Sequence, residues 1–255
     1  MKNMNTLLFV LILSGAAFAY ADDAPYESTY KPLPYTNTIF RNANIYDGDG
    51  NEFQNTDLFI RDGKIIAIGK DLPGSSDFIE IDASNKWITP GIIDIHSHMG
   101  VYPAPSVRTS SDGNEATSPV TADVWAEHSI WVQDPQFALA LKGGVTTFHV
   151  LPGSANLIGG RGVTAKNLQR NTINSMKYPN APHSLKMACG ENPKRVYGNR
   201  NQAPSTRMGN IAGYRKSWIK AKAYLSRMDE YEAKSDEAKE IGYKPTRDLE
   251  LDTLA

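Results

Sequence analysis

A short apolar strand that runs directly into two histidines constrains this chain more than any other feature. Pro90 precedes the run Gly91-Ile92-Ile93-Asp94-Ile95, which leads into His96-Ser97-His98. Because side chains alternate along a strand, His96 and His98 project to the same side, where two imidazole nitrogens can bind one metal ion. We predict a buried parallel strand whose C-terminal end carries the pair, which is where a β/α barrel builds its active site. The alternative is a strand end with two solvated or hydrogen-bonded histidines.

The N-terminus has the pattern of a secretory signal peptide. Lys2 precedes an apolar run from Leu7 to Ala17, and Ala19 and Ala21 are small residues suited to cleavage. We therefore predict a signal peptide over residues 1–21 and a secreted or periplasmic location. An uncleaved membrane anchor is the alternative, although the apolar run is short for a transmembrane helix.

The composition fits a globular protein and argues against several classes of partner. Apolar residues make up 40% and charged residues 22% of the chain, as in ordinary folded domains. The formal net charge of −1 offers no basic surface for nucleic acid, and no later segment is apolar for long enough to cross a membrane. We expect a small-molecule substrate as the partner and leave a homo-oligomer open. Cys189 is the only cysteine, so an intramolecular disulfide is excluded, and we expect its side chain to be buried.

Turns and strands divide the rest of the chain into two parts. A connector rich in Pro and Tyr over residues 22–35 precedes short strands separated by Gly, Asp and Asn, which predict a small β-sandwich over residues 36–88. Further on, Asp134-Pro135 begins a helix that Gly143-Gly144 ends, and residues 145–150 form a second buried strand. Strand, helix and strand make a βαβ unit, which predicts an α/β domain with a parallel sheet.

The last third of the chain carries weaker signals. Residues 184–191 predict a strand that ends in the carboxylate of Glu191, whereas Gly159-Gly160-Arg161-Gly162 predicts a turn. Residues 192–200 indicate a basic surface loop. Residues 214–240 predict one long solvated helix with a narrow apolar stripe.

The chain resembles the amino-terminal part of the amidohydrolase superfamily, and most of all its imidazolonepropionase-like members. The resemblance covers residues 36–255 and rests on the β module, the strand into His96-Ser97-His98 and the later run Gly143-Gly144-Val145-Thr146-Thr147. It implies a (β/α)8 barrel over residues 89–255, which is incomplete because a full barrel needs about 250 residues of its own. It also implies hydrolysis of carbon–nitrogen bonds other than ordinary peptide bonds, in cyclic amides or dipeptide-like substrates.

The resemblance implies a divalent metal, commonly zinc, bound by His96 and His98. The third ligand that it implies is a glutamate or a carboxylated lysine on a later strand; Glu191 is our first choice, with Lys186 and Lys166 as alternatives. Such a metal lowers the pKa of a bound water and polarises the carbonyl to be attacked. The other two histidine ligands and the proton-transferring aspartate of the family have no counterpart in this sequence, so we assign no catalytic residue.

Three hypotheses remain from the sequence alone. The first is an exported metal-dependent hydrolase, represented by its amino-terminal portion. The second is a catalytically inactive fragment, or a binding protein that retains part of the metal site. The third is a β-rich adhesion or carbohydrate-binding module, which accounts for residues 36–88 and leaves the rest unexplained. For His149, on the second strand, we expect a buried hydrogen-bonded role rather than metal binding.

Overall fold

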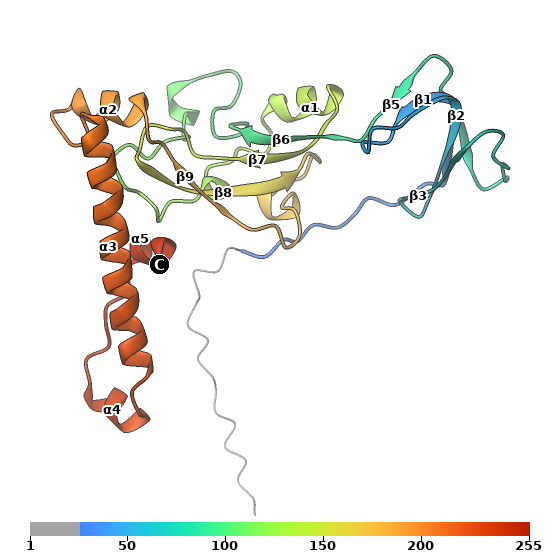
Figure 1. Ribbon diagram of the computed structural model, residues 1–255. Helices are drawn as coiled ribbons and strands as arrows, with labels where there is room; N and C mark the ends of the chain where they lie inside the picture. Colours follow the sequence, from blue (N-terminus) through green and yellow to red (C-terminus); the bar gives the residue numbers. More distant parts are fainter. Residues whose placement is uncertain (1–25) are drawn as a thin grey trace, which may run out of the picture.

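The computed structural model describes residues 26–255, so the predicted signal peptide over residues 1–21 lies outside the described residues. Residues 26–37 form neither helix nor strand, and Ser28 and Thr29 bind the backbone of residues 174–177. Two sheets follow along the chain, and a group of helices ends it (Figure 1). Within residues 26–255, no helix combines the length and apolar character needed to span a membrane.

The first sheet is a mixed five-stranded sheet. Its strands are β1 (Thr38–Tyr46), β2 (Glu52–Arg61), β3 (Lys64–Gly69), β4 (Ile79–Asp82) and β5 (Trp87–Ile88). β1, β2 and β3 form an antiparallel meander, whereas β4 and β5 both pair with β1 in parallel. The predicted β-sandwich is therefore one sheet in the described residues. The physical reason is that β1 is long enough for β4 and β5 to pair with it one after the other along the same edge.

The hairpin between β2 and β3 shows how local turn chemistry fixes this module. Asp62 and Gly63 connect the strands, and their φ angles are 50° and 71°. A two-residue hairpin turn requires such a left-handed backbone, which Gly adopts freely and Asp tolerates. A side chain on Gly63 would also collide with the ring of Tyr35. The turn expected between these strands is confirmed.

The second sheet contains four strands in the order β6, β7, β8 and β9. Their bounds are β6 (Ile92–Ser97), β7 (Val145–Val150), β8 (Ile158–Lys166) and β9 (Ser184–Met187). β6 and β7 pair in parallel and are joined through helix α1 (Pro135–Lys142), which confirms the predicted βαβ unit. β8 runs antiparallel to both of its neighbours, so the sheet is mixed rather than wholly parallel. β6, β7 and β9 share one direction, and their C-terminal ends lie at one edge.

β8 contains the Gly159-Gly160-Arg161-Gly162 run, for which the turn prediction was wrong. Glycine is uncommon inside strands, but it is used where another backbone approaches closely. A Cβ on Gly162 would lie 2.6 Å from Ser184 Oγ and 2.9 Å from the Val150 carbonyl oxygen. The glycines therefore permit this strand at a place with no room for side chains.

β6 is more exposed than the sequence predicts. Ile93 and Ile95 are 62% and 77% exposed, and Ile92 is also exposed. Among the described residues, β6 pairs with β7 alone. The prediction of a strand buried on both faces was wrong, because no described element packs on these isoleucines or pairs with the free edge of β6.

Helix α1 covers one face of β7 and β8. Asp134 caps it by accepting a hydrogen bond from the backbone N–H of Gln136, as the sequence predicts, and Phe137 stacks on Phe148 with ring centroids 5.0 Å apart. Burial of such aromatic rings stabilises the domain by roughly 2–3 kcal/mol each. The buried core cluster on this face consists of Val101, Ala126, Val132, Phe137, Phe148, Val150, Val163, Ala165 and Met176.

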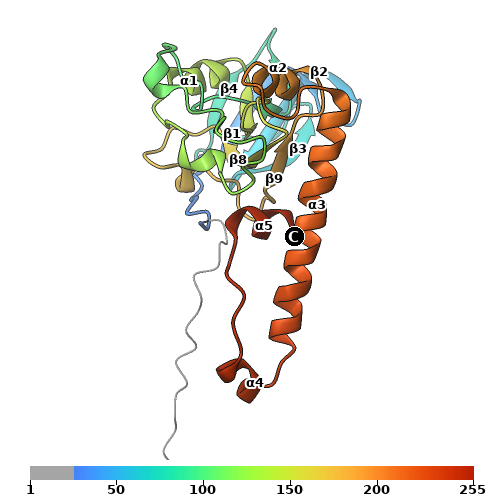
Figure 2. The same ribbon diagram turned by 90° about the vertical axis from the view of Figure 1, so that its left-hand side faces the viewer.

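The C-terminal part consists of α2 (Glu191–Gly198), α3 (Arg207–Glu232), α4 (Asp236–Ile241) and α5 (Leu249–Leu254). α3 extends well beyond the second sheet, and Figure 2 shows α5 lying against its middle, where Ala221 and Leu254 share a buried cluster. The single helix predicted over residues 214–240 is two helices, because Ser235 caps a new one.

Two further predictions about this region were wrong. The basic loop expected over residues 192–200 is helical as far as Gly198. Its Asn and Pro lie in the first turn, where Pro is tolerated, so these residues begin a helix instead of preventing one. Cys189, expected to be buried, is exposed.

Candidate metal centre

One face of the second sheet is polar and lies opposite the apolar core. Residues of β7 and β8 alternate between the two faces, so His149 and its cross-strand partner Thr164 point away from that core. On β9, Ser184 and Lys186 occupy the same polar face through their pairing with glycines of β8. This face is therefore the place where polar side chains of several strands can meet.

His149 on this face is held by two hydroxyl groups. Its Nδ1 lies 2.9 Å from Thr164 Oγ1, and its Nε2 lies 2.6 Å from Ser184 Oγ. Burial, and then the nearby His183 and His96, lower the pKa of His149. Both ring nitrogens are engaged, so His149 has the hydrogen-bonded role that we expected from the sequence.

His96 and Lys186 come from opposite ends of the strand order, yet Lys186 Nζ lies 3.1 Å from His96 Nε2. In a flat sheet, strands three positions apart are roughly 14 Å from one another. The contact therefore requires that the sheet curls and that both side chains project from its concave face. The charge of Lys186, followed by burial and His98, lowers the pKa of His96, while burial lowers the pKa of Lys186.

The backbone sets the orientation of His98. Its Nδ1 lies 2.9 Å from the carbonyl oxygen of Leu151. A carbonyl oxygen only accepts, so Nδ1 donates this hydrogen bond, and in the neutral ring Nε2 then has the lone pair with which imidazole binds metals. The rings of His96 and His98 have centroids 5.2 Å apart. Two imidazoles bound to one tetrahedral ion have a centroid separation of about 5 Å, so this pair fits a shared metal.

Glu191 is not brought to the histidine pair. The strand predicted through residue 191 ends at Met187, and Glu191 instead begins α2 with a side chain that is 71% exposed. Its Oε1 accepts a hydrogen bond from Arg195 Nε at 2.8 Å. Within residues 26–255, no three His, Cys, Asp or Glu side chains cluster in a way that could hold a metal.

The two lysines considered as alternatives differ in position. Lys166 Nζ lies over the rings of Tyr30 and Tyr178, 5.1 Å and 4.5 Å from their centroids, whereas Lys186 reaches His96. A lysine ammonium repels a cation, but a carboxylated lysine is an anion with oxygen ligands. The donors that meet at His96 therefore fit a divalent metal if Lys186 is carboxylated.

A cavity of about 260 Å³ adjoins His98. Its other lining residues are Tyr102, Asn114, Gly153, Ser154, Ala155, Asn192, Arg195 and Val196. Asn192, Arg195 and Val196 come from α2, which the sequence had predicted as a loop. These residues are three and four positions apart in the sequence, a spacing that puts side chains on one face of a helix and could have indicated this arrangement.

No protein-family model matches the chain. The amidohydrolase tasK of Hapsidospora irregularis is 32% identical to it over 249 residues, which is 85% of this chain and 25% of tasK. A solved amidohydrolase from Thermotoga maritima MSB8 matches with a TM-score of 0.73 and 37% identity, over 85% of this chain and 54% of that one. The chain belongs to the amidohydrolase superfamily. A dihydroorotase of Ligilactobacillus salivarius is also similar, at 44% identity over 63 residues, or 24% of this chain and 14% of the dihydroorotase.

Membership of this superfamily of metal-dependent hydrolases confirms the superfamily resemblance seen in the sequence, and the likeness to its imidazolonepropionase-like members stays a prediction. The chain spans about a quarter of the length of tasK and about half of the Thermotoga amidohydrolase. A β-sheet module followed by a curled sheet with helices thus corresponds to part of a larger amidohydrolase fold.

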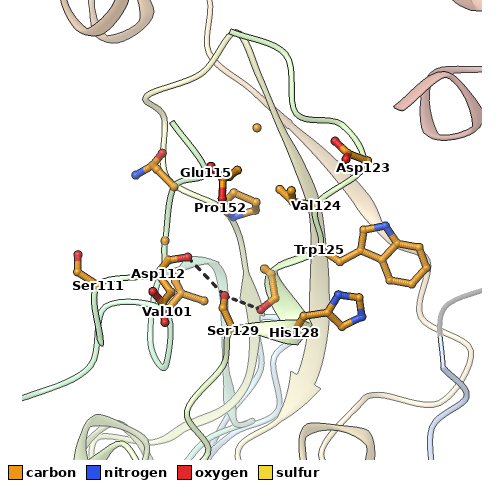
Figure 3. A pocket seen from close by; sticks show the side chains of 14 residues that line it. Val101, Ser111, Asp112, Glu115, Asp123, Val124, Trp125, His128, Ser129 and Pro152 are labelled. Atoms are coloured by element: carbon orange, nitrogen blue, oxygen red, sulfur yellow. Dashed lines mark hydrogen bonds between the residues drawn. The ribbon is translucent and has the colours of Figure 1, made fainter. Parts of the chain in front are cut away.

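A second cavity of this amidohydrolase chain, of about 450 Å³, has an acidic lining (Figure 3). Asp112, Glu115 and Asp123 line it, and no Lys, Arg, His96 or His98 does. The Ser129 hydroxyl donates a hydrogen bond to the Ala126 carbonyl oxygen at 3.2 Å, which orders the chain segment beside this cavity (Figure 3). Neither histidine of the pair lines this cavity, so it is separate from the candidate metal centre.

Proposed function

We propose that the chain forms part of an exported metal-dependent hydrolase that cleaves carbon–nitrogen bonds other than ordinary peptide bonds, in a cyclic amide or a dipeptide-like substrate. The observation that carries this proposal is the meeting of His96, His98 and Lys186 at the C-terminal edge of the curled sheet. Membership of the amidohydrolase superfamily supports the reaction class. The signal-peptide pattern over residues 1–21 supports export.

His96 and His98 would hold a divalent metal, of which zinc suits imidazole nitrogen best among the common hydrolytic ions. Lys186 replaces Glu191 as our choice of third ligand, because it lies against His96 while Glu191 is paired with Arg195. The neutral Lys186 amine would add CO₂: a nitrogen–carbon bond forms, a C=O bond becomes a carboxylate, and the nitrogen releases one proton.

The bound metal would supply a water of lowered pKa and polarise the substrate carbonyl. The chain's own residues orient the site. The Leu151 carbonyl oxygen fixes the His98 ring, and His149 holds Ser184 on the same strand as Lys186. The cavity beside His98 offers the space for the substrate. We assign no proton-transfer group.

Metal content tests this proposal. Purified full-length protein is loaded with Zn²⁺ in bicarbonate buffer, and its zinc is measured by elemental analysis. We expect His96→Ala, His98→Ala and Lys186→Met to lose most of the zinc, and His128→Ala, an exposed histidine on the acidic cavity, to keep it. Carbon-13 NMR after ¹³C-bicarbonate loading should show a carbamate signal that Lys186→Met lacks. A wild type without zinc would contradict the proposal, as would loss of zinc in Glu191→Gln with Lys186→Met unaffected.

A metal-binding protein without hydrolase activity is the second candidate. The incomplete donor set favours it, because the described residues supply two imidazoles and one lysine, without a carboxylate cluster. Stable zinc binding without hydrolysis of any cyclic amide or N-acyl amino acid tested would favour this candidate over the enzyme.

A further inference from the structure

The cavity beside His98 contains one permanently charged side chain, the guanidinium of Arg195. We propose that Arg195, supported by Asn192, binds a carboxylate of the substrate, so that the hydrolase acts on a cyclic amide or N-acyl compound that carries a carboxylate close to the scissile bond. This inference rests on the proposed function, because the proposed function puts the reacting centre at the His98 end of the same cavity.

Helix α2 is a rigid support for Arg195. Tyr197 is fully buried, and its hydroxyl lies 2.7 Å from Asn156 Oδ1. Pro193 is also fully buried. These two residues anchor one side of α2, and Asn192, Arg195 and Val196 on another side line the cavity. A packed helix therefore sets the backbone of Arg195, and its guanidinium, on a side chain that is 59% exposed, is held by Glu191.

The hydrogen bonds of Arg195 leave it able to bind an anion. Its Nε donates to Glu191 Oε1 at 2.8 Å, and its two terminal nitrogens make no hydrogen bond to any residue that the structure describes. An arginine held in this way presents two parallel N–H donors, which match the two oxygens of a carboxylate. We therefore assign Glu191 the role of positioning Arg195, and not the role of metal ligand that the sequence suggested.

The remaining lining favours an anion over a cation. The uncharged amides of Asn192 and Asn114 are ordered by hydrogen bonds: Asn192 Nδ2 donates to Ser154 Oγ at 2.6 Å, and Asn114 Nδ2 donates to the Tyr102 hydroxyl. No Asp or Glu lines this cavity, in contrast to the acidic cavity of Figure 3. Its volume of about 260 Å³ lies below the roughly 300–1,000 Å³ of drug-sized ligand pockets, which suits a small substrate.

Two matched probes test the proposal with zinc-loaded full-length protein. Hydantoin-5-acetate and hydantoin-5-acetamide share a cyclic amide ring and differ by one negative charge. Their dissociation constants are measured by titration calorimetry. We expect the wild type to bind the acetate about tenfold more tightly than the amide, as a partly exposed charge-assisted bidentate contact gives. Arg195→Gln should abolish this preference and Arg195→Lys should keep part of it, while Arg227→Gln, an exposed arginine of α3, should not change it.

Equal affinity of the wild type for both probes, including no binding of either at millimolar concentration, overturns the proposal. So does an unchanged preference in Arg195→Gln. Zinc content is measured for every variant, because Arg195→Gln should retain its zinc. If Arg195→Gln loses the preference for the acetate but retains its zinc, the result tests the role of Arg195. If the wild type binds no zinc, the result contradicts the proposed function instead.

The positioning role of Glu191 has its own readout. Glu191→Gln should reduce the preference for the acetate without changing zinc content or amide affinity, and Glu191→Asp should restore part of it. A purely structural role would move both affinities together. A loss of zinc in Glu191→Gln would return Glu191 to the metal site and overturn this assignment.

Discussion

Lys177→Met is expected to destabilise the protein by about 3–5 kcal/mol, because it removes the ammonium group that pairs with the buried carboxylate of Glu127 and leaves only the imidazoles of His183 and His128, 3.9 Å and 4.0 Å away. Lys177 Nζ lies 2.8 Å from Glu127 Oε1, and the two side chains are 5% and 1% exposed. Lys177 also donates to the Tyr26 carbonyl oxygen, while Glu127 Oε2 has no hydrogen-bond partner in the described part of the chain.

The magnitude follows from distance and burial. At a separation of 2.8 Å and an effective dielectric constant of about 20, the attraction is about 6 kcal/mol. In the wild type, desolvation of both charges cancels most of this energy. The substitution removes the attraction while the Glu127 charge stays buried, so the loss exceeds the net contribution of the pair. Met is close to Lys in length, so packing is largely kept.

Urea unfolding of Lys177→Met, Glu127→Leu and the double variant measures this energy. The double variant should recover much of the loss, because it removes both charges. Lys239→Met is the matched control: its partner Glu232 lies 3.0 Å away, but that side chain is 62% exposed, so we expect a loss below about 1 kcal/mol. A Lys177→Met loss below about 1 kcal/mol, or a double variant as unstable as the singles, would refute the reasoning.

Three further predictions concern other parts of the molecule. Burial raises the pKa of Asp57, but hydrogen bonds from the Asn42 backbone, the Arg41 guanidinium and the Leu72 backbone outweigh burial and hold that pKa below its usual value. The first sheet should therefore lose stability as the pH falls below about 4. Asp57→Asn should flatten the pH dependence of the urea unfolding midpoint. Gly162→Ala should cost about 1–3 kcal/mol, because its Cβ would lie 2.6 Å from Ser184 Oγ. Gly159→Ala, in the same strand but with its nearest neighbouring atom at 3.4 Å, should cost much less, and equal losses in thermal unfolding would contradict this difference. We expect the wild type to self-associate through β6, because Ile93 and Ile95 are 62% and 77% exposed on a strand that has one partner among the described residues. Ile93→Lys with Ile95→Lys should reduce this association in size-exclusion chromatography with light scattering, and a monomeric wild type or an unchanged mass distribution would argue against an adhesive edge.

Local features were predicted well because their physical causes lie within a few residues. The alternation of side chains along a strand placed His96 and His98 on one side, and the structure gives their rings a separation suited to one metal. Asp134 caps α1, and Asp62-Gly63 turns the chain, for equally local reasons. The superfamily resemblance rested on the combination of such features.

Errors arose where distant segments decide the outcome. Gly162 suggested a turn, yet it lies in a strand because Ser184 and the Val150 backbone approach it closely. The isoleucines of β6 suggested burial on both faces, but burial depends on a neighbour that the described residues do not supply. Hydrophobic patterns state a preference for burial and cannot say what covers a surface.

By itself the sequence determined the histidine pair, the βαβ unit that presents it and the superfamily, because each depends on residues close together in the chain or on a motif. Only the tertiary structure decided that Lys186, and not Glu191, lies beside His96. Ninety residues separate Lys186 from His96, and the curl of the second sheet closes that separation. The same packing turns Glu191 onto α2 beside Arg195, since β9 ends at Met187 and the chain begins a helix before the carboxylate can reach the concave face.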